Sequence, residues 1–374
     1  MFFHIILTGE CNLECKYCFG EALEDMDDSF MNFDVDYCLP KKINYEVSLL
    51  DKFCRRDDEC VLTFYGGEPL LCISEIKRIM DNVKAEHFMI QTNGLLLHRL
   101  EPEYVNRLHT ILVSIDGDEV LTDFYRGKGT FRKVIDNLKL ITRNGFGGEL
   151  IARMTVMEKT DIYKQVRWLL DNEIFPFSSV HWQLNAGFWG NDFGRRDFKR
   201  WSRESYNPGI RKLVEFWIDQ MEKNRAILRL YPFLGIAHSF LSGEGKSFLR
   251  CGGGWINYAI QTDGYIVPCP AMWGMKDYYV GHVSNANPLR LRKVFVGEPC
   301  PECDILHVCG GRCLYANITK RWNKEEYGLV CATVRNLVDA VAEEVPRIRK
   351  LMENGRISLK DFEFMKYNGC EIIP

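Results

Sequence analysis

Short apolar runs alternate with amphipathic stretches through the first half of the chain. Apolar residues recur with helical spacing over Ile73 to Val83, Phe131 to Arg143 and Ile162 to Asn172. Six runs rich in β-branched and aromatic residues predict strands over Phe2 to Thr8, Cys60 to Gly67, Phe88 to Gly94, Thr110 to Gly117, Leu150 to Met157 and Val180 to Gly187. Strands that are apolar along their length are buried on both faces, as in parallel sheets covered by helices. We therefore predict an α/β fold whose six βα units form an open, partial (β/α)6 TIM-like barrel.

Composition narrows the class of protein. The 374 residues carry 48 Lys+Arg against 51 Asp+Glu, a net charge of -3 that gives no sign of a nucleic-acid surface. The apolar run at the start is about seven residues, far short of the roughly twenty that span a bilayer, so we expect no membrane association. Fifteen cysteines without a signal peptide favour a cytoplasmic protein that uses thiols for metal or redox chemistry.

Three of these cysteines follow the first predicted strand. Cys11, Cys15 and Cys18 have spacings of four and three, which suit three irons of one 4Fe-4S cube and leave the fourth iron without a protein ligand. An open iron can chelate a substrate or cofactor, whereas an electron-transfer cluster normally has four cysteines. The alternative is a zinc knuckle, which would need Cys38 as a distant fourth ligand.

A second set of cysteines lies in the last third of the chain. The order is C-x12-G-x4-C, a gap, C-x2-C-x5-C-x3-C, a further gap and a last cysteine. Its cysteines are Cys251, Cys269, Cys300, Cys303, Cys309, Cys313 and Cys331, with Gly264 as the glycine. A C-x2-C pair also occurs in zinc ribbons, but seven ligand-like cysteines downstream of an open-cluster loop favour iron and sulfide.

Both patterns resemble those of radical S-adenosylmethionine (SAM) enzymes with a C-terminal SPASM domain. The resemblance implies that Cys11, Cys15 and Cys18 hold a cluster whose open iron binds SAM, and that reductive cleavage of SAM gives a 5'-deoxyadenosyl radical. It also implies two auxiliary 4Fe-4S clusters, three clusters in all, within a small cysteine-rich α+β domain. One would be held by Cys300, Cys303, Cys309 and Cys331, and the other by Cys251, Cys269 and Cys313. Family members with a complete first auxiliary cluster have a further cysteine where this chain has Asn257, so that iron is either open or bound by another ligand.

Function in parallel α/β folds is found at the carboxyl ends of strands. The second predicted strand ends in Gly66, Gly67 and Glu68, which matches the family's GGE motif and implies contact with the amino group of SAM. Two glycines let backbone approach a ligand closely. The next two strands end near Asn93 and Ser114, which suit cofactor hydrogen bonds but also ordinary turns.

Three further residues are candidates for cofactor binding. Arg126 resembles the family's segment after the fourth strand, where a guanidinium can clamp a carboxylate. Arg153 lies inside the fifth predicted strand and needs an anionic partner, either the cofactor or a protein carboxylate. Tyr17 is placed where the family packs an aromatic ring near the adenine. The catalytic acid or base remains unassigned.

These features give four predicted regions. They are a radical SAM core over 1–190, a bridging region over 191–245, the SPASM domain over 246–340, and a C-terminal helix and tail over 341–374. An apolar-periodic run from about Cys331 predicts the terminal helix. The aromatic-rich stretch around the first boundary, which includes Phe188, Phe198 and Trp201, either lines a substrate groove or packs in a core.

By this resemblance, the first functional hypothesis is modification of a ribosomally made peptide or small protein, by a crosslink, thioether, epimerisation or oxidation. Small-molecule cofactor maturation, of tetrapyrrole or quinone type, is the alternative. A sulfatase-type maturase is less favoured, because the resembling branch has an aspartate where this chain has Pro270. A non-enzymatic iron-sulfur carrier leaves the open cluster and the GGE motif unexplained. The expected partners are the substrate, a flavodoxin or ferredoxin as electron donor, and a separate peptide-recognition protein.

Overall fold

The computed structural model describes residues 1–18, 33–243 and 248–370, which form two compact units. Unit 1 comprises Met1–Ile115, Glu119–Ile151 and Gly252–Phe295, and unit 2 comprises Asp116–Asp118, Ala152–Cys251 and Val296–Pro374. The chain thus enters unit 2 within strand β5 (Glu149–Val156) and returns to unit 1 after Cys251.

Unit 1 is built on a sheet whose neighbouring strands are β10-β9-β8-β1-β2-β3-β4. Its strands are β1 (Phe2–Thr8), β2 (Val61–Gly66), β3 (His87–Thr92), β4 (Leu108–Ser114), β8 (Asn257–Ile260), β9 (Tyr265–Val267) and β10 (Gly281–His282). Strands β1 to β4 are parallel and follow sequence order, with Phe3 opposite Leu62 and Ile90 opposite Ile111. Strand β8 adds to the other edge of β1 in parallel, whereas β9 and β10 are antiparallel. The first four predicted strands are therefore confirmed.

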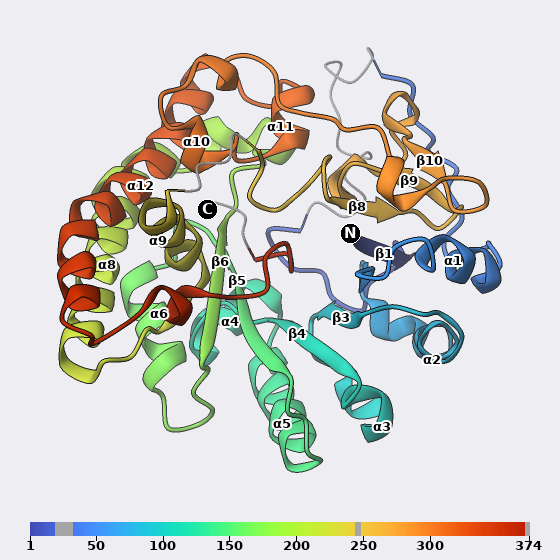
Figure 1. The fold of residues 1–374 in the computed structure, drawn as a ribbon, viewed down its shortest axis with the longest axis horizontal. Helices are drawn as coiled ribbons and strands as arrows, with labels where there is room; N and C mark the ends of the chain where they lie inside the picture. Colours follow the sequence, from blue (N-terminus) through green and yellow to red (C-terminus); the bar gives the residue numbers. More distant parts are fainter. Residues whose placement is uncertain (19–32, 244–247, 371–374) are drawn as a thin grey trace. The chain divides into compact units, whose positions relative to one another are not determined.

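Helices cover the parallel strands of unit 1, as their apolar sequences require. They are α1 (Val47–Cys54), α2 (Ile73–Asn82), α3 (Pro102–Val105), α4 (Glu119–Arg126) and α5 (Thr130–Arg143), with shorter turns η2 (Pro69–Cys72), η3 (Leu97–Arg99), η6 (Pro270–Met272), η7 (Lys276–Tyr278) and η8 (Pro288–Arg290). Figure 1 shows α1, α2 and α3 along one side of the strands. Phe3, Ile5 and Leu7 on one face of β1 are buried, and so are His4, Ile6 and Thr8 on the other, so both faces of the strand are covered.

Unit 2 contains the rest of β5 and its neighbours β6 (Ser179–Leu184) and β7 (Arg229–Leu230). Its helices are α6 (Ile162–Asp171), α7 (Phe198–Trp201), α8 (Asn207–Asn224), α9 (Tyr231–Ser242), α10 (Leu306–Cys309), α11 (Leu314–Ile318) and α12 (Lys324–Glu353), with η4 (Trp189–Arg195), η5 (Ser202–Tyr206), η9 (Cys300–Glu302) and η10 (Leu359–Phe362). Helices α8 and α12 lie side by side, linked by Arg211 on α8 and Glu343 on α12 at 2.8 Å (Figure 1).

The terminal helix starts earlier than the apolar pattern indicates. Asn323 caps α12 by accepting bonds from Glu325 N and Glu326 N, and the Glu326 carboxylate accepts a bond from Asn323 N. This reciprocal capping box fixes the start at Lys324, seven residues before the predicted Cys331. The prediction missed it because the first two turns, Lys324 to Cys331, are mostly polar.

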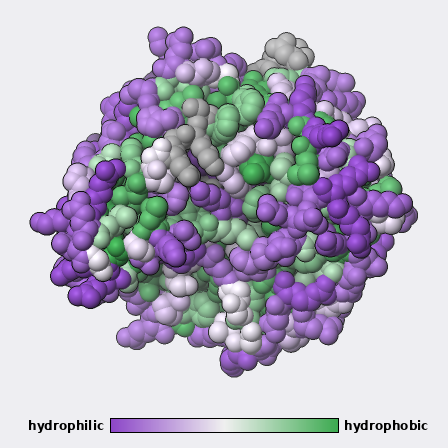
Figure 2. Space-filling model, in the orientation of Figure 1, coloured by the Kyte–Doolittle hydropathy of each residue, from purple (hydrophilic) through white to green (hydrophobic). Residues whose placement is uncertain are grey.

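No helix of the described ranges is long and apolar enough to cross a membrane. Figure 2 shows polar and charged residues over much of the visible face, with apolar residues in small groups between them. This distribution agrees with the nearly balanced charge of the sequence.

Candidate active site

The first cysteine loop lies in unit 1, directly after β1. Cys11 and Cys18 are exposed and Cys15 is half-buried. A turn bond from Cys18 N to Cys15 O (2.8 Å) closes the second half of the loop, and Lys16 N donates to Tyr125 O on α4 (2.9 Å). The loop is therefore held by its backbone while its thiols stay accessible.

Gly66 and Gly67 pack against the backbone segment that leads into this loop. A Cβ on either glycine would lie 2.3 Å from a backbone oxygen, that of Thr8 for Gly66 and that of Glu10 for Gly67. Gly67 N also donates to Thr8 O, and Glu68 N to Glu10 O, each at 2.9 Å. The glycines were predicted to let backbone approach a ligand. The close approach in the structure is to the backbone leading into the cysteine loop.

Glu68 is a fully buried carboxylate that joins the ends of β2 and β3. Its Oε1 accepts bonds from Leu70 N (2.9 Å) and Thr92 Oγ1 (2.8 Å), and its Oε2 accepts one from Asn93 N (2.7 Å). Burial raises the pKa of Glu68 above its ordinary value, and the three hydrogen bonds oppose that rise. Glu68 thus fixes the strand ends beside the thiols.

Asn93 connects this network to the cysteines. Its Nδ2 donates to Asn12 Oδ1 at 2.7 Å and lies 3.8 Å from Cys11 Sγ, while its Oδ1 accepts a bond from Leu95 N at 3.0 Å. The sequence left Asn93 open between a cofactor role and a turn role. In the structure its side chain makes the turn and also points its N–H groups at the thiol loop.

Tyr17 and Arg126 come together on the α4 side of the loop. The guanidinium carbon of Arg126 lies 5.3 Å from the centre of the Tyr17 ring, and that ring is 5.3 Å from the ring of Tyr125. Arg126 is buried, whereas Tyr17 is half-buried. Ser114 is the half-buried last residue of β4. The structure therefore brings Tyr17 and Arg126 together within unit 1, and their cofactor roles stay a prediction.

Arg153 belongs to unit 2. Of its two expected partners, the cofactor and a protein carboxylate, the second is not found among the described residues. Its Nη2 donates to Gln183 Oε1 on β6 at 2.7 Å, and no described residue forms an ion pair with it. Its Nε is buried without a hydrogen-bond partner. Such an unsatisfied donor has a free-energy cost, and the cofactor role of Arg153 stays a prediction.

The cysteines of the second set range from buried Cys300 to exposed Cys331. Cys300 is buried, and its Sγ lies 3.1 Å from Tyr327 OH and 3.7 Å from Asn317 Nδ2. Burial raises the pKa values of Cys300 and Cys309, so both thiols stay protonated at neutral pH until a metal displaces the proton. Cys300, Cys303, Cys309 and Cys331 all belong to unit 2, as the predicted four-cysteine cluster requires.

The other predicted auxiliary set is divided in the chain. Cys269 belongs to unit 1, whereas Cys251 and Cys313 belong to unit 2, so this ligand set stays a prediction. Asn257, at the position of the missing cysteine, is a buried residue of β8, and its Oδ1 lies 3.0 Å from His4 Nδ1 on β1. The side-chain oxygen of Asn257 is thus engaged within unit 1.

No three His, Cys, Asp or Glu side chains of the described residues converge as they would around a single metal ion. A 4Fe-4S cube takes its thiolates on separate irons. Three cysteines on an accessible loop, with the Asn93 amide directed at Cys11, offer the type of donor that such a cluster binds.

One buried charged cluster was not assigned a role from the sequence. Arg196 Nε contacts Glu158 Oε1 at 2.8 Å, and Arg196 Nη1 lies 3.9 Å from Asp192 Oδ1. Asp192 Oδ1 is buried without a hydrogen-bond partner, and burial raises the pKa of Asp192. These residues follow β5 and β6, at the strand ends where function is found. The available signal was the pair of charges among aromatic residues near Phe188 and Phe198, which are themselves buried.

A comparison with protein families supports the resemblance that the thiol loop indicated. Residues 5–163 match the model of the Radical SAM superfamily. These residues form a radical SAM domain. The resemblance stated from the cysteine loop is thereby confirmed, and the matched range contains Cys11, Glu68 and Asn93, the residues that the structure joins in one network.

The chain is also similar to proteins of two kinds. A cysteine-type anaerobic sulfatase-maturating enzyme of Clostridium perfringens is 21% identical over 89% of this chain and 93% of its own length. The solved structure of anSMEcpe with bound AdoMet has a TM-score of 0.69 at 18% identity and covers 94% of this chain and 99% of its own. Streptococcus suis SuiB bound to its precursor peptide SuiA has a TM-score of 0.53 at 17% identity, covering 85% of this chain and 72% of its own. At these identities the two structures confirm the α/β fold.

Proposed function

We propose that this chain is a radical SAM oxidoreductase that modifies a ribosomally made peptide or small protein. The observation that carries the proposal is the accessible three-thiol loop, which Glu68 and Asn93 anchor at the carboxyl ends of β2 and β3. A 4Fe-4S cluster bound there supplies the electron that cleaves SAM to a hydrogen-abstracting 5'-deoxyadenosyl radical. Similarity to a sulfatase-maturating enzyme and to a peptide-bound SuiB supports a polypeptide as the substrate.

The residues of the chain have distinct roles in this proposal. Cys11, Cys15 and Cys18 hold the cluster, and Asn93 donates hydrogen bonds toward Cys11, which favours the thiolate form. Glu68 positions Asn93 through its backbone N–H. Tyr17 provides an aromatic face for the adenine beside the Arg126 guanidinium. Gly66 and Gly67 keep the loop backbone close to β2, and Ser114 adds a hydroxyl at the end of β4.

Arg153 and the remaining cysteines complete the proposed cofactor set. The unsatisfied Arg153 Nε suits the carboxylate of SAM. Two auxiliary 4Fe-4S clusters, held by the second cysteine set, bring the total to three. A flavodoxin or ferredoxin would supply the electron, and a separate recognition protein would present the peptide. The cytoplasmic location also stays a prediction.

The test is an anaerobic assay of the reconstituted protein with SAM and a reductant. We expect 5'-deoxyadenosine and methionine from the wild type, and neither from a variant with Cys11, Cys15 and Cys18 changed to Ala. A matched variant with Cys38→Ala should keep the activity, because Cys38 is an exposed free thiol outside the loop. Loss of SAM cleavage in the Cys38→Ala variant, or its survival in the triple variant, would contradict the assignment.

A sulfatase-type maturase is the second candidate, because the similarity to the sulfatase-maturating enzyme extends over most of both chains. Pro270, where the resembling branch has an aspartate, begins the turn η6 and offers no proton acceptor. Cysteine-containing sulfatase peptides, ribosomal precursor peptides and a porphyrin can be compared by mass spectrometry. A mass change in the precursor peptides alone supports the first proposal, whereas a change in the porphyrin alone overturns it.

A further inference from the structure

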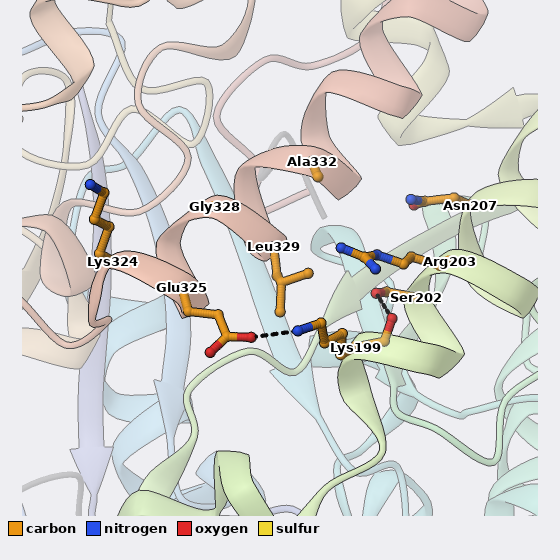
Figure 3. Close-up of a pocket in the computed structure, with 9 residues that line it drawn as sticks. All are labelled: Lys199, Ser202, Arg203, Asn207, Lys324, Glu325, Gly328, Leu329 and Ala332. Atoms are coloured by element: carbon orange, nitrogen blue, oxygen red, sulfur yellow. Dashed lines mark hydrogen bonds and ion pairs between the residues drawn. The ribbon is translucent and has the colours of Figure 1, made fainter.

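A cavity in unit 2 is lined by cations that the proposed chemistry does not use. It has a volume of about 330 Å³ and lies between the start of α12 and the segment from α7 to the start of α8 (Figure 3). Lys199 and Arg203 line it from the α7 segment, and Lys324 and Glu325 from α12. In Figure 3 the side chains of Lys199 and Arg203 point toward α12.

The charges in this cavity do not balance. Lys199 Nζ pairs with Glu325 Oε1 at 2.8 Å. Neither Arg203 nor Lys324 forms an ion pair with any residue in the described part of the chain. The lining thus carries three cations, Lys199, Arg203 and Lys324, against the single carboxylate of Glu325. This excess of positive charge favours an anionic occupant.

A further feature of the lining favours a peptide side chain over a simple anion. Leu329 and Ala332 add apolar surface for the aliphatic part of a side chain. Gly328 is exposed, and no atom lies within 4 Å of a Cβ placed there, so this position has room for a larger side chain.

We propose that this cavity binds an acidic segment of the peptide substrate through a Glu or Asp carboxylate. The inference rests on the proposed function, since it names the charge of that peptide. Arg203 and Lys324 would hold the carboxylate. Gly328 lies three residues before Cys331 on α12, so the docked segment would lie along the helix that carries a predicted cluster ligand.

The experiment measures binding and not catalysis, so its failure is distinguishable from failure of the proposed function. The probe is a fluorescein-labelled tetraglutamate peptide, with tetraglutamine as the uncharged comparison, and the readout is fluorescence anisotropy on the reconstituted full chain. We expect tetraglutamate to bind the wild type. Arg203→Gln and Lys324→Gln should each weaken binding about fivefold, as for a partly exposed charge pair.

Gly328→Glu should abolish binding by placing a carboxylate in the cavity, whereas Gly328→Ala should change it less than twofold. The matched control is Arg290→Gln, since Arg290 is an exposed cation on η8 of unit 1 without an ion pair among the described residues. Loss of binding confined to the cavity variants supports the proposal. Equal loss in Arg290→Gln, equal binding of tetraglutamine, or displacement by equimolar sulfate would overturn it.

Discussion

The two cysteine regions differ in how the protein surrounds the sulfur atoms. In unit 1 the thiols of Cys11 and Cys18 are exposed, and the buried polar groups lie behind the loop, centred on Glu68. In unit 2 Cys300 is buried and has donors directly at its sulfur, Tyr327 OH and Asn317 Nδ2. The first arrangement leaves room for an exchangeable ligand, whereas in the second the sulfur of Cys300 is enclosed, although Cys331 of that set is exposed. We expect this difference if the first loop holds a cluster with an open iron and the second set holds a cluster with four protein ligands.

The strongest way to break this comparison is to remove the buried support of the first loop. Glu68→Ala would leave the donors of Leu70, Thr92 and Asn93 without their acceptor. We expect the free energy of unfolding to fall by about 3 kcal/mol, because unsatisfied buried donors are costly. The measurement is urea unfolding of the protein before reconstitution.

Glu86→Ala is the matched control for that experiment, since Glu86 is exposed and should stay within about 0.5 kcal/mol of the wild type. If Glu68→Ala were as stable as Glu86→Ala, the loop would not depend on the buried carboxylate.

The second cysteine region can be tested by removing the Tyr327 hydroxyl that contacts Cys300 Sγ. Tyr327→Phe removes the hydroxyl 3.1 Å from Cys300 Sγ and should make iron loss to a chelator about tenfold faster, as for other partners of metal ligands. SAM cleavage should persist, because the first loop is unchanged. Tyr163→Phe, whose hydroxyl contacts only Arg167 among the described residues, should release iron at the wild-type rate. Identical rates for both variants would refute an enclosed cluster at Cys300.

A variant of Arg153 tests whether this residue contributes to the binding of SAM. Arg153→Met loses one hydrogen bond to Gln183 and an unsatisfied Nε. We expect affinity for SAM to fall about tenfold, with little change in the unfolding midpoint, because the charge is used by the ligand and not by the fold. Equilibrium dialysis with labelled SAM gives the affinity. An unchanged affinity, with Arg290→Met as the control, would remove Arg153 from the site.

The smallest effect is expected at the amino ends of strands β3 and β4 in unit 1. The His87 and His109 rings lie 4.3 Å apart, and burial followed by the charge of His87 lowers the pKa of His109. A depressed pKa in the folded protein gives stability that is present above the unfolded value of about 6.5 and is lost as the pH falls through the folded value.

The unfolding temperature of the wild type should therefore fall between about pH 7.5 and pH 5.5 by more than that of His109→Gln. The exposed His98→Gln variant should keep the wild-type slope. Parallel slopes for all three proteins would contradict the assignment. SAM binding should be equal in all of them.

The sequence predicted the elements well where periodicity and burial agree. The apolar run at Phe2 and the helix at Ile73 begin at the predicted residues, because each buries one face or both. It predicted α12 from its apolar stripe and missed its polar start, where capping and not burial sets the boundary.

From the sequence, only those parts of the site could be predicted whose residues lie close together along the chain. Loop cysteines and the GGE motif are visible in sequence, since neighbours in the chain stay neighbours in space. The three donors of Glu68, which include Thr92 and Asn93 on another strand, depend on strand register and were not predicted. The Glu158–Arg196–Asp192 cluster was missed for the same reason, because its members come from two strand ends.

The central claim is that Cys11, Cys15 and Cys18 hold one SAM-binding cluster, separate from the clusters of the second cysteine set. Its most direct test is iron and sulfide content, with Mössbauer spectra, on anaerobically reconstituted wild type and on the variant with these three cysteines changed to Ala. The account predicts about twelve irons in the wild type and about eight in the variant, with SAM cleavage lost. About four irons with bound zinc in the wild type, or an unchanged iron count in the variant, would contradict it.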